Sequence, residues 1–103
     1  MHGLTPLESN LTERDLKSLL ESGLGWTRDG ETLTKTFRCK GWKSAIALID
    51  RIARAAEEVD HHPDIHLERY RSVRIVTTTF ATGKLSDADV ALARRIDEVA
   101  EPT

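Results

Sequence analysis

Residues 41–63 read GWKSAIALIDRIARAAEEVDHHP, and this stretch decides the fold. Its apolar residues recur every three or four positions, which predicts an amphipathic helix over residues 41–58. The predicted apolar face consists of Trp42, Ala45, Ile46, Ile49, Ile52, Ala53 and Ala56. Pro63 disfavours helical geometry at the residue before it, so we expect the helix to end ahead of His62.

The segments on either side of this helix predict two β-hairpins and two further helices. Residues 11–22 and residues 86–100 each place apolar side chains at helical spacing. Asp29-Gly30 indicates a tight turn within a hairpin over residues 26–38. Residues 65–70 and 73–80 predict a second hairpin, whose later strand alternates Val73, Ile75, Thr77 and Thr79 on one face. This order predicts an α+β fold, a four-stranded antiparallel sheet with three helices packed on one face.

Two Ser/Thr-x-x-Asp pairs indicate where the first and the last helix begin. Thr12 precedes Asp15, and Ser86 precedes Asp89, in each case by three residues. In a capping box, the two side chains accept hydrogen bonds from backbone N–H groups that the first helical turn leaves unpaired. We therefore interpret Asp89 as a capping residue rather than as a catalyst.

Length and composition indicate a single domain over residues 1–103, of which residues 1–10 are expected to be flexible. The net charge of −2 gives no basic bias, so we expect no direct binding to nucleic acid. No apolar run approaches the length of a membrane helix, and no signal peptide is visible. Cys39 is the only cysteine, which excludes an internal disulfide and fits a cytoplasmic protein.

Three histidines lie within six residues, at the junction between the long helix and the following strand: His61, His62 and His66. Imidazole is the side chain best suited to proton transfer near neutral pH. A metal site is the first alternative, but His-His-x-Asp-x-His matches no zinc spacing with a geometric rationale, so we expect no metal. A polar loop whose histidines have no shared role is the second alternative.

Glu57-x-x-x-His61-His62-Pro63, Tyr70, a threonine-rich strand end and Gly83-x-Leu85-Ser86-x-x-Asp89 together resemble the pterin-4a-carbinolamine dehydratase family. Gly25-Trp26 and the segment from Phe37 to Trp42 extend the resemblance to residues 11–100. The resemblance implies removal of water from a 4a-hydroxytetrahydropterin to give quinonoid dihydropterin, which recycles tetrahydrobiopterin. It also implies a homodimer or homotetramer, and a reaction without metal or organic cofactor.

The resemblance implies roles for seven residues of the chain. His61 and His62 would transfer protons. Glu57 would orient one of them, or it is a solvated residue of the helix. Asp60 would contribute to the pterin pocket, and Thr78 and Thr79 would line its other side. Phe80 stands where the family carries another histidine. A phenylalanine transfers no proton but can stack on a flat pterin ring.

Phe80 leaves two functions open. The first is a dehydratase with reduced efficiency that works through His61 and His62, with His66 as a candidate substitute for the missing histidine. The second is a non-catalytic scaffold that binds a protein partner, because proteins that resemble this family include transcriptional coactivators and Rubisco assembly factors.

Overall fold

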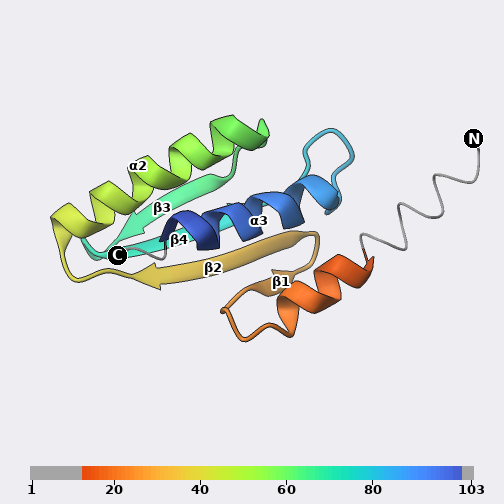
Figure 1. Ribbon diagram of the computed structural model, residues 1–103, viewed down its shortest axis with the longest axis horizontal. Coiled ribbons are helices and arrows are strands. Elements are labelled where there is room, and N and C mark those ends of the chain that lie inside the picture. The colour runs from red at the N-terminus through yellow and green to blue at the C-terminus, as the bar shows by residue number, and fades with distance from the viewer. Residues whose placement is uncertain (1–12, 101–103) are drawn as a thin grey trace, which may run out of the picture.

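The computed structural model describes residues 13–100. A first helix covers residues 13–20 and is followed by two strands, β1 (Thr27–Asp29) and β2 (Thr32–Arg38). The long helix α2 (Trp42–Val59) leads into β3 (Asp64–Glu68) and β4 (Ser72–Thr77), and α3 (Asp87–Ala100) ends the described chain (Figure 1). Thr12, the expected cap of the first helix, and residues 1–10 lie outside the described residues.

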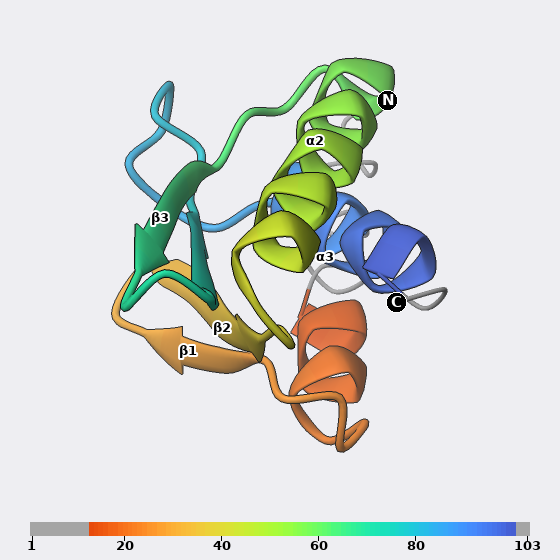
Figure 2. The same cartoon turned by 90° about the vertical axis from the view of Figure 1, so that its left-hand side faces the viewer.

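The four strands form one antiparallel sheet in the order β1-β2-β4-β3. All three helices lie on the same side of this sheet (Figure 2). The α+β fold predicted from the residue pattern is therefore confirmed. Gly30 adopts φ 62° in the turn between β1 and β2, a left-handed conformation that glycine adopts without steric cost. Arg69 and Tyr70 adopt φ 50° and 58° between β3 and β4, so β3 ends two residues earlier than predicted.

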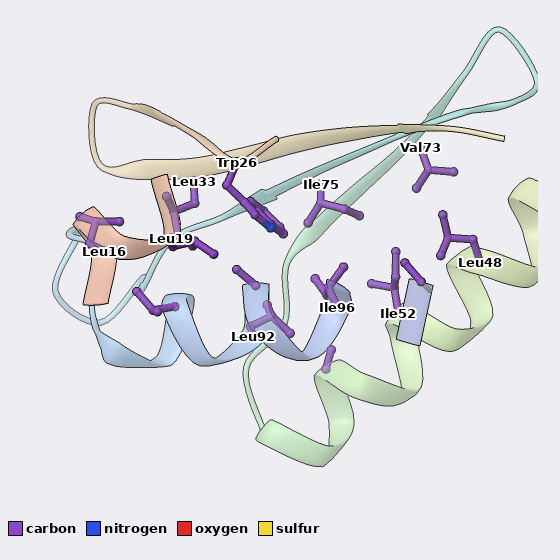
Figure 3. Close-up of a cluster of buried hydrophobic side chains, with 14 of the residues drawn as sticks. Leu16, Leu19, Trp26, Leu33, Leu48, Ile52, Val73, Ile75, Leu92 and Ile96 are labelled. Carbon is purple, nitrogen blue, oxygen red and sulfur yellow. The ribbon is translucent and has the colours of Figure 1, made fainter. Parts of the chain in front are cut away.

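The core lies between the helices and the inner face of the sheet (Figure 3). Val73, Ile75 and Thr77 of β4, which the alternation predicts on one face, are all buried, so this face is the inner one. Leu92 and Ile96 of α3 are fully buried in the same core cluster as Val73 and Ile75. α3 is thereby fixed over the centre of the sheet, with its first turn close to the end of β4.

The apolar face predicted for α2 was partly wrong. Ala45, Ile52 and Ala56 are buried as expected, and Leu48 and Ala55 join them. Trp42 and Ile46 remain 57% and 44% exposed, and Ala53 is also exposed. The apolar arc of α2 is wider than the core can cover, so one stripe of it faces outward.

β4 ends at Thr77, three residues before the predicted end. The pairing of β2 with β4 ends where Leu33, the second residue of β2, pairs with Thr77. The residues after Thr77 therefore do not pair with β2. Residues 80–83 turn back, and Thr79 forms an isolated bridge with Lys84. The residues expected at the strand end therefore belong to a loop that leads into α3.

Candidate active site

The C-terminus of α2 directs its two histidines to different partners. Asp60 caps the helix in a left-handed conformation, with φ 55° and ψ 45°, and its N–H bonds to carbonyl oxygens of the last turn. The N–H of His61 reaches the Ala56 carbonyl at 3.1 Å, which completes a Schellman-type ending. This sharp turn sends the His61 side chain towards α3, while the His62 side chain returns to α2.

Asp89, in the first turn of α3, is the centre of the site. Its side chain is fully buried and accepts four hydrogen bonds. Oδ1 accepts from His61 Nε2 at 2.7 Å and from Thr77 Oγ1 at 2.6 Å. Oδ2 accepts from Thr79 Oγ1 at 2.7 Å and from the Ser86 N–H at 3.0 Å. The Ser86 bond is the predicted capping box, so Asp89 both caps α3 and holds a histidine.

This arrangement fixes the tautomer of His61. An ionised carboxylate only accepts hydrogen bonds, so Nε2 of His61 must carry the proton that faces Asp89. The other ring nitrogen, Nδ1, then has a lone pair that the contact with Asp89 leaves unused. The His61 side chain is 14% exposed, so the imidazole is held firmly while one edge remains open. A carboxylate that orients an imidazole in this way prepares it to act as a base.

His62 is paired with the other candidate residue, Glu57. Its Nε2 lies 2.5 Å from Glu57 Oε2, and both side chains are more than half exposed. This short contact joins the two side chains on the surface beside the end of α2. The two histidines therefore differ, because one is backed by a buried carboxylate and the other by an exposed one.

Thr78 and Phe80 point away from the Asp89 network. The Thr78 hydroxyl donates to the Glu31 carbonyl at 2.6 Å, and Phe80 is 79% exposed. Glu31 also accepts the Leu85 N–H at 3.0 Å, so the turn between β1 and β2 clamps the loop on both sides of Phe80. This backbone hydrogen bond holds the pKa of the Glu31 carboxyl below its ordinary value, and nearby Arg28 acts in the same direction.

His66 is not brought to this site. It pairs with Arg74 across β3 and β4, while its neighbour Ile65 pairs with the buried Ile75. Side chains alternate between the two faces of a sheet, so His66 lies on the face opposite the helices. Within residues 13–100, no three His, Cys, Asp or Glu side chains are grouped as a metal site would require. No helix in this part of the chain is long and apolar enough to cross a membrane.

The sequence pattern does not indicate that Asp89 holds His61 or that Thr77 bonds to Asp89. Asp89 was interpreted as a cap alone, and Thr77 as one member of an alternating strand face. The capping box and the strand alternation place each residue correctly within its own element. Neither pattern indicates that one oxygen of Asp89 accepts hydrogen bonds from both Thr77 and His61.

Known protein families and curated proteins include relatives of this chain. The family model described as pterin 4 alpha carbinolamine dehydratase matches residues 9–99. Two curated relatives bear the name "Putative pterin-4-alpha-carbinolamine dehydratase". The relative from Thermomicrobium roseum is 39% identical over 92 residues, which cover 89% of this chain and 98% of the relative. The relative from Nocardia farcinica is 40% identical over 90 residues, which cover 87% and 94%.

Two solved structures share the fold. One is a transcriptional coactivator/pterin dehydratase from Brucella melitensis, with a TM-score of 0.75 and 26% identity over 86% of this chain and 96% of that one. The other is a pterin dehydratase-like protein identified as a RuBisCO assembly factor in the alpha-carboxysome. It has a TM-score of 0.64 and 27% identity over 77% of this chain and 93% of that one. The extent of the family match and the identity to full-length relatives show that this chain belongs to the pterin 4 alpha carbinolamine dehydratase family.

Proposed function

We infer that the chain dehydrates a 4a-hydroxytetrahydropterin to the quinonoid dihydropterin. In this reaction the N5–H bond and the bond from C4a to the hydroxyl break, a C4a–N5 double bond forms, and water leaves. One group must accept the N5 proton and another must protonate the departing hydroxyl. Both steps are general acid–base catalysis, which two differently supported imidazoles provide.

The observation that carries this proposal is the bond between His61 and the buried Asp89. Asp89 holds the proton of His61 on Nε2, so Nδ1 is the nitrogen that accepts the N5 proton. The negative charge of Asp89 stabilises the imidazolium that then forms. Because the carboxylate has no contact with solvent, this stabilisation is not weakened by water.

His62 is the proposed acid. Its Nε2 contacts the Glu57 carboxylate, and its 58% exposed side chain is accessible to a ligand. His62 passes a proton to the 4a-hydroxyl, and water leaves. His61 then releases to solvent the proton that it took from N5, and His62 regains a proton from solvent. Glu57 acts through His62 and is a positioning residue in this scheme.

The remaining predicted site residues would shape the pterin pocket. Asp60 directly precedes His61 in the chain, and Thr79 bonds to the same Asp89 side chain as His61. Thr78 begins the loop that carries Phe80. An exposed phenyl ring at this position offers a stacking surface to a pterin. Loss of one proton-transfer group costs roughly a hundredfold to ten-thousandfold in rate, so we expect a weak dehydratase.

A second candidate function is a scaffold that binds a protein partner. The supporting observation is Phe80, which is 79% exposed on a loop clamped by Glu31. Exposed aromatic side chains are frequent anchors in protein interfaces. The assembly-factor structure named above has the same fold, and its role was assigned to that protein.

The test is dehydration of freshly generated 4a-hydroxytetrahydropterin by the wild type and by His61→Ala, Phe80→His and His66→Ala. The dehydratase proposal predicts a wild-type rate above the uncatalysed rate, loss of the gain in His61→Ala, and a higher rate in Phe80→His. His66→Ala is the matched control, because this histidine lies on the other face of the sheet. A wild type that is inert while Phe80→His gains activity would favour the scaffold function.

A further inference from the structure

A cavity of about 420 Å³ lies beside the start of α2. It is formed by the end of β2, the link between β2 and α2, and the first half of α2. Figure 1 shows these segments at the end of α2 that is opposite to the chain leading into β3. The 18 residues of α2 separate its two ends by about 27 Å, at about 1.5 Å of rise per residue. The cavity is therefore separate from the His61 site, and its volume is in the range of sites for small organic molecules.

The charged side chains that line this cavity are all basic: Arg38, Lys40 and Arg51. No Asp or Glu among residues 13–100 lines it. None of the three basic side chains forms an ion pair with another residue of the described chain. Arg38 and Lys40 are exposed, whereas Arg51 is half-buried. Three positive charges that share one cavity without a counterion favour an anion as its ligand.

The guanidinium of Arg51 is fixed in place, but it is not fully hydrogen-bonded. Its Nε donates to the Val99 carbonyl at 2.8 Å, which ties the side chain to the last turn of α3. Its Nη2 is buried and has no hydrogen-bond partner in the part of the chain that the structure describes. A buried donor without a partner is uncommon in folded proteins and costs free energy. An acceptor supplied by a bound anion would remove this cost.

The first turn of α2 adds further hydrogen-bond donors beside these cations. Gly41 precedes the helix and provides no side-chain cap, and the first turn contains no acidic residue. The N–H groups of a first helical turn have no partner within the helix, and the positive end of the helix dipole lies there. Ser44, the third residue of α2, lines the cavity with its hydroxyl group. Phosphate groups are favoured at such a helix start.

A second, smaller cavity extends the basic surface. Its volume is about 240 Å³, it shares Arg38 with the first cavity, and it adds Arg69 and Arg71. Its lining within the described chain also contains no Asp or Glu. The whole chain has a net charge of −2, so the positive charge is concentrated at this end of the sheet. A local concentration of one sign of charge attracts ligands of the opposite sign and accelerates their association.

We propose that the larger cavity binds a small organic phosphate, with the phosphate group among Arg38, Lys40 and Arg51. A guanidinium donates paired hydrogen bonds to phosphate oxygens, and an ammonium group adds a compact positive charge. A phosphate monoester carries nearly two negative charges at neutral pH, so it matches three cations better than a carboxylate does. Phe37 and Leu48 supply apolar lining for the organic part of the ligand.

The first experiment titrates the full chain with phenyl phosphate by isothermal titration calorimetry. We expect saturable binding with a dissociation constant below about 1 mM. Phenyl sulfate has a similar shape but one negative charge, and inorganic phosphate lacks the ring, so each should bind at least about tenfold more weakly. Phenol, which lacks the anionic group, should show no saturable binding. The absence of saturation by phenyl phosphate, or equal affinity for any of the three comparison ligands, would overturn the proposal.

The second experiment locates the binding with matched variants. Lys40→Gln removes a cation that lines the cavity, whereas Lys43→Gln removes an exposed lysine that does not line it. Lys40→Gln should weaken the binding of phenyl phosphate about threefold to tenfold, and Lys43→Gln should change it by less than about twofold. Arg51→Lys retains the charge but loses the guanidinium fork, and should weaken binding about tenfold. Circular dichroism checks that the variants remain folded. Equal losses in Lys40→Gln and Lys43→Gln would overturn the proposal.

Cys39 reports directly on occupancy of the cavity. It is the only cysteine of the chain, and it lines the cavity together with Arg51. Phenyl phosphate at about ten times its dissociation constant should slow alkylation of Cys39 by the neutral reagent iodoacetamide about tenfold, because the bound ligand covers the thiol. An alkylation rate that does not change at saturation would overturn the proposal. Dehydration is not measured in these experiments, so their outcome is independent of the proposed dehydratase function.

Discussion

Replacement of Asp89 by asparagine is the substitution that separates its role towards His61 from its role as a helix cap. The Ser86 N–H can only donate a hydrogen bond, so the amide oxygen of the introduced asparagine must take the place of Oδ2. The amide NH₂ group then takes the place of Oδ1 and faces His61 and Thr77. His61 must accept that hydrogen bond through Nε2, which moves its proton to Nδ1. The lone pair assigned to the base is lost although the fold is kept.

The expected magnitudes follow from the four hydrogen bonds of Asp89. A bond to a charged group contributes about 1.5–3 kcal/mol, and a bond between neutral groups about 0.5–1.5 kcal/mol. The side chain is fully buried, so Asp89→Asn should lower the free energy of unfolding by about 2–4 kcal/mol. This loss is smaller than the total stability of most domains, so the variant should remain folded. The rate of dehydration should fall by about a hundredfold to ten-thousandfold, since the base carries the wrong tautomer.

Two measurements test this reasoning. Nitrogen-15 NMR of the imidazole ring should show the proton on Nε2 of His61 in the wild type and on Nδ1 in Asp89→Asn. Stopped-flow assays of dehydration should show the loss of rate in the same variant, and urea unfolding should show the loss of stability. The reasoning is refuted if wild-type His61 carries its proton on Nδ1, or if Asp89→Asn retains the wild-type rate.

Three further predictions concern stability and reactivity. The hydrogen bond from the Leu85 N–H lowers the pKa of the Glu31 carboxyl. The ionised carboxylate therefore stabilises the fold at a pH above 4.5, the ordinary pKa of this group, and this stabilisation is lost as the pH falls through the lowered pKa. Urea midpoints should therefore converge for wild type and Glu31→Gln at low pH and differ at pH 7; equal midpoints at both would contradict this. Asp60→Val should lower the free energy of unfolding by about 1–3 kcal/mol in thermal melts, because φ is 55°, whereas Asp60→Gly should cost less. Burial raises the pKa of the Cys39 thiol, so alkylation near pH 8 should be slower in the folded protein than in urea, and equal rates would count against it.

The residue pattern was sufficient to predict the elements and their layers. Asp29-Gly30 marks the first hairpin, and the alternation in β4 identifies the strand face that the helices cover. These signals are local, because they depend on residues within one element or one turn. They therefore agree with the structure even where an element ends a few residues earlier than expected.

The pattern could not predict contacts between elements distant in the chain. Asp89 has the same capping signature whether or not a histidine reaches it from the end of α2. Trp42 and Ile46 fit a helical periodicity equally well whether they face the core or the exterior. Such outcomes depend on how α2 and α3 pack together, which the local spacing does not specify. His61 and His62 could be proposed as site residues from the sequence because their own motif is distinctive.

The central claim is that this chain dehydrates a 4a-hydroxytetrahydropterin through His61, and that Asp89 acts through His61. The most direct measurement compares kcat/KM for wild type, His61→Ala, Asp89→Asn and the double variant in one dehydration assay. The account predicts a wild-type rate above the uncatalysed rate, a large loss in each single variant, and a double variant no slower than His61→Ala. A wild type with no activity, or a double variant in which the two losses multiply, would contradict it.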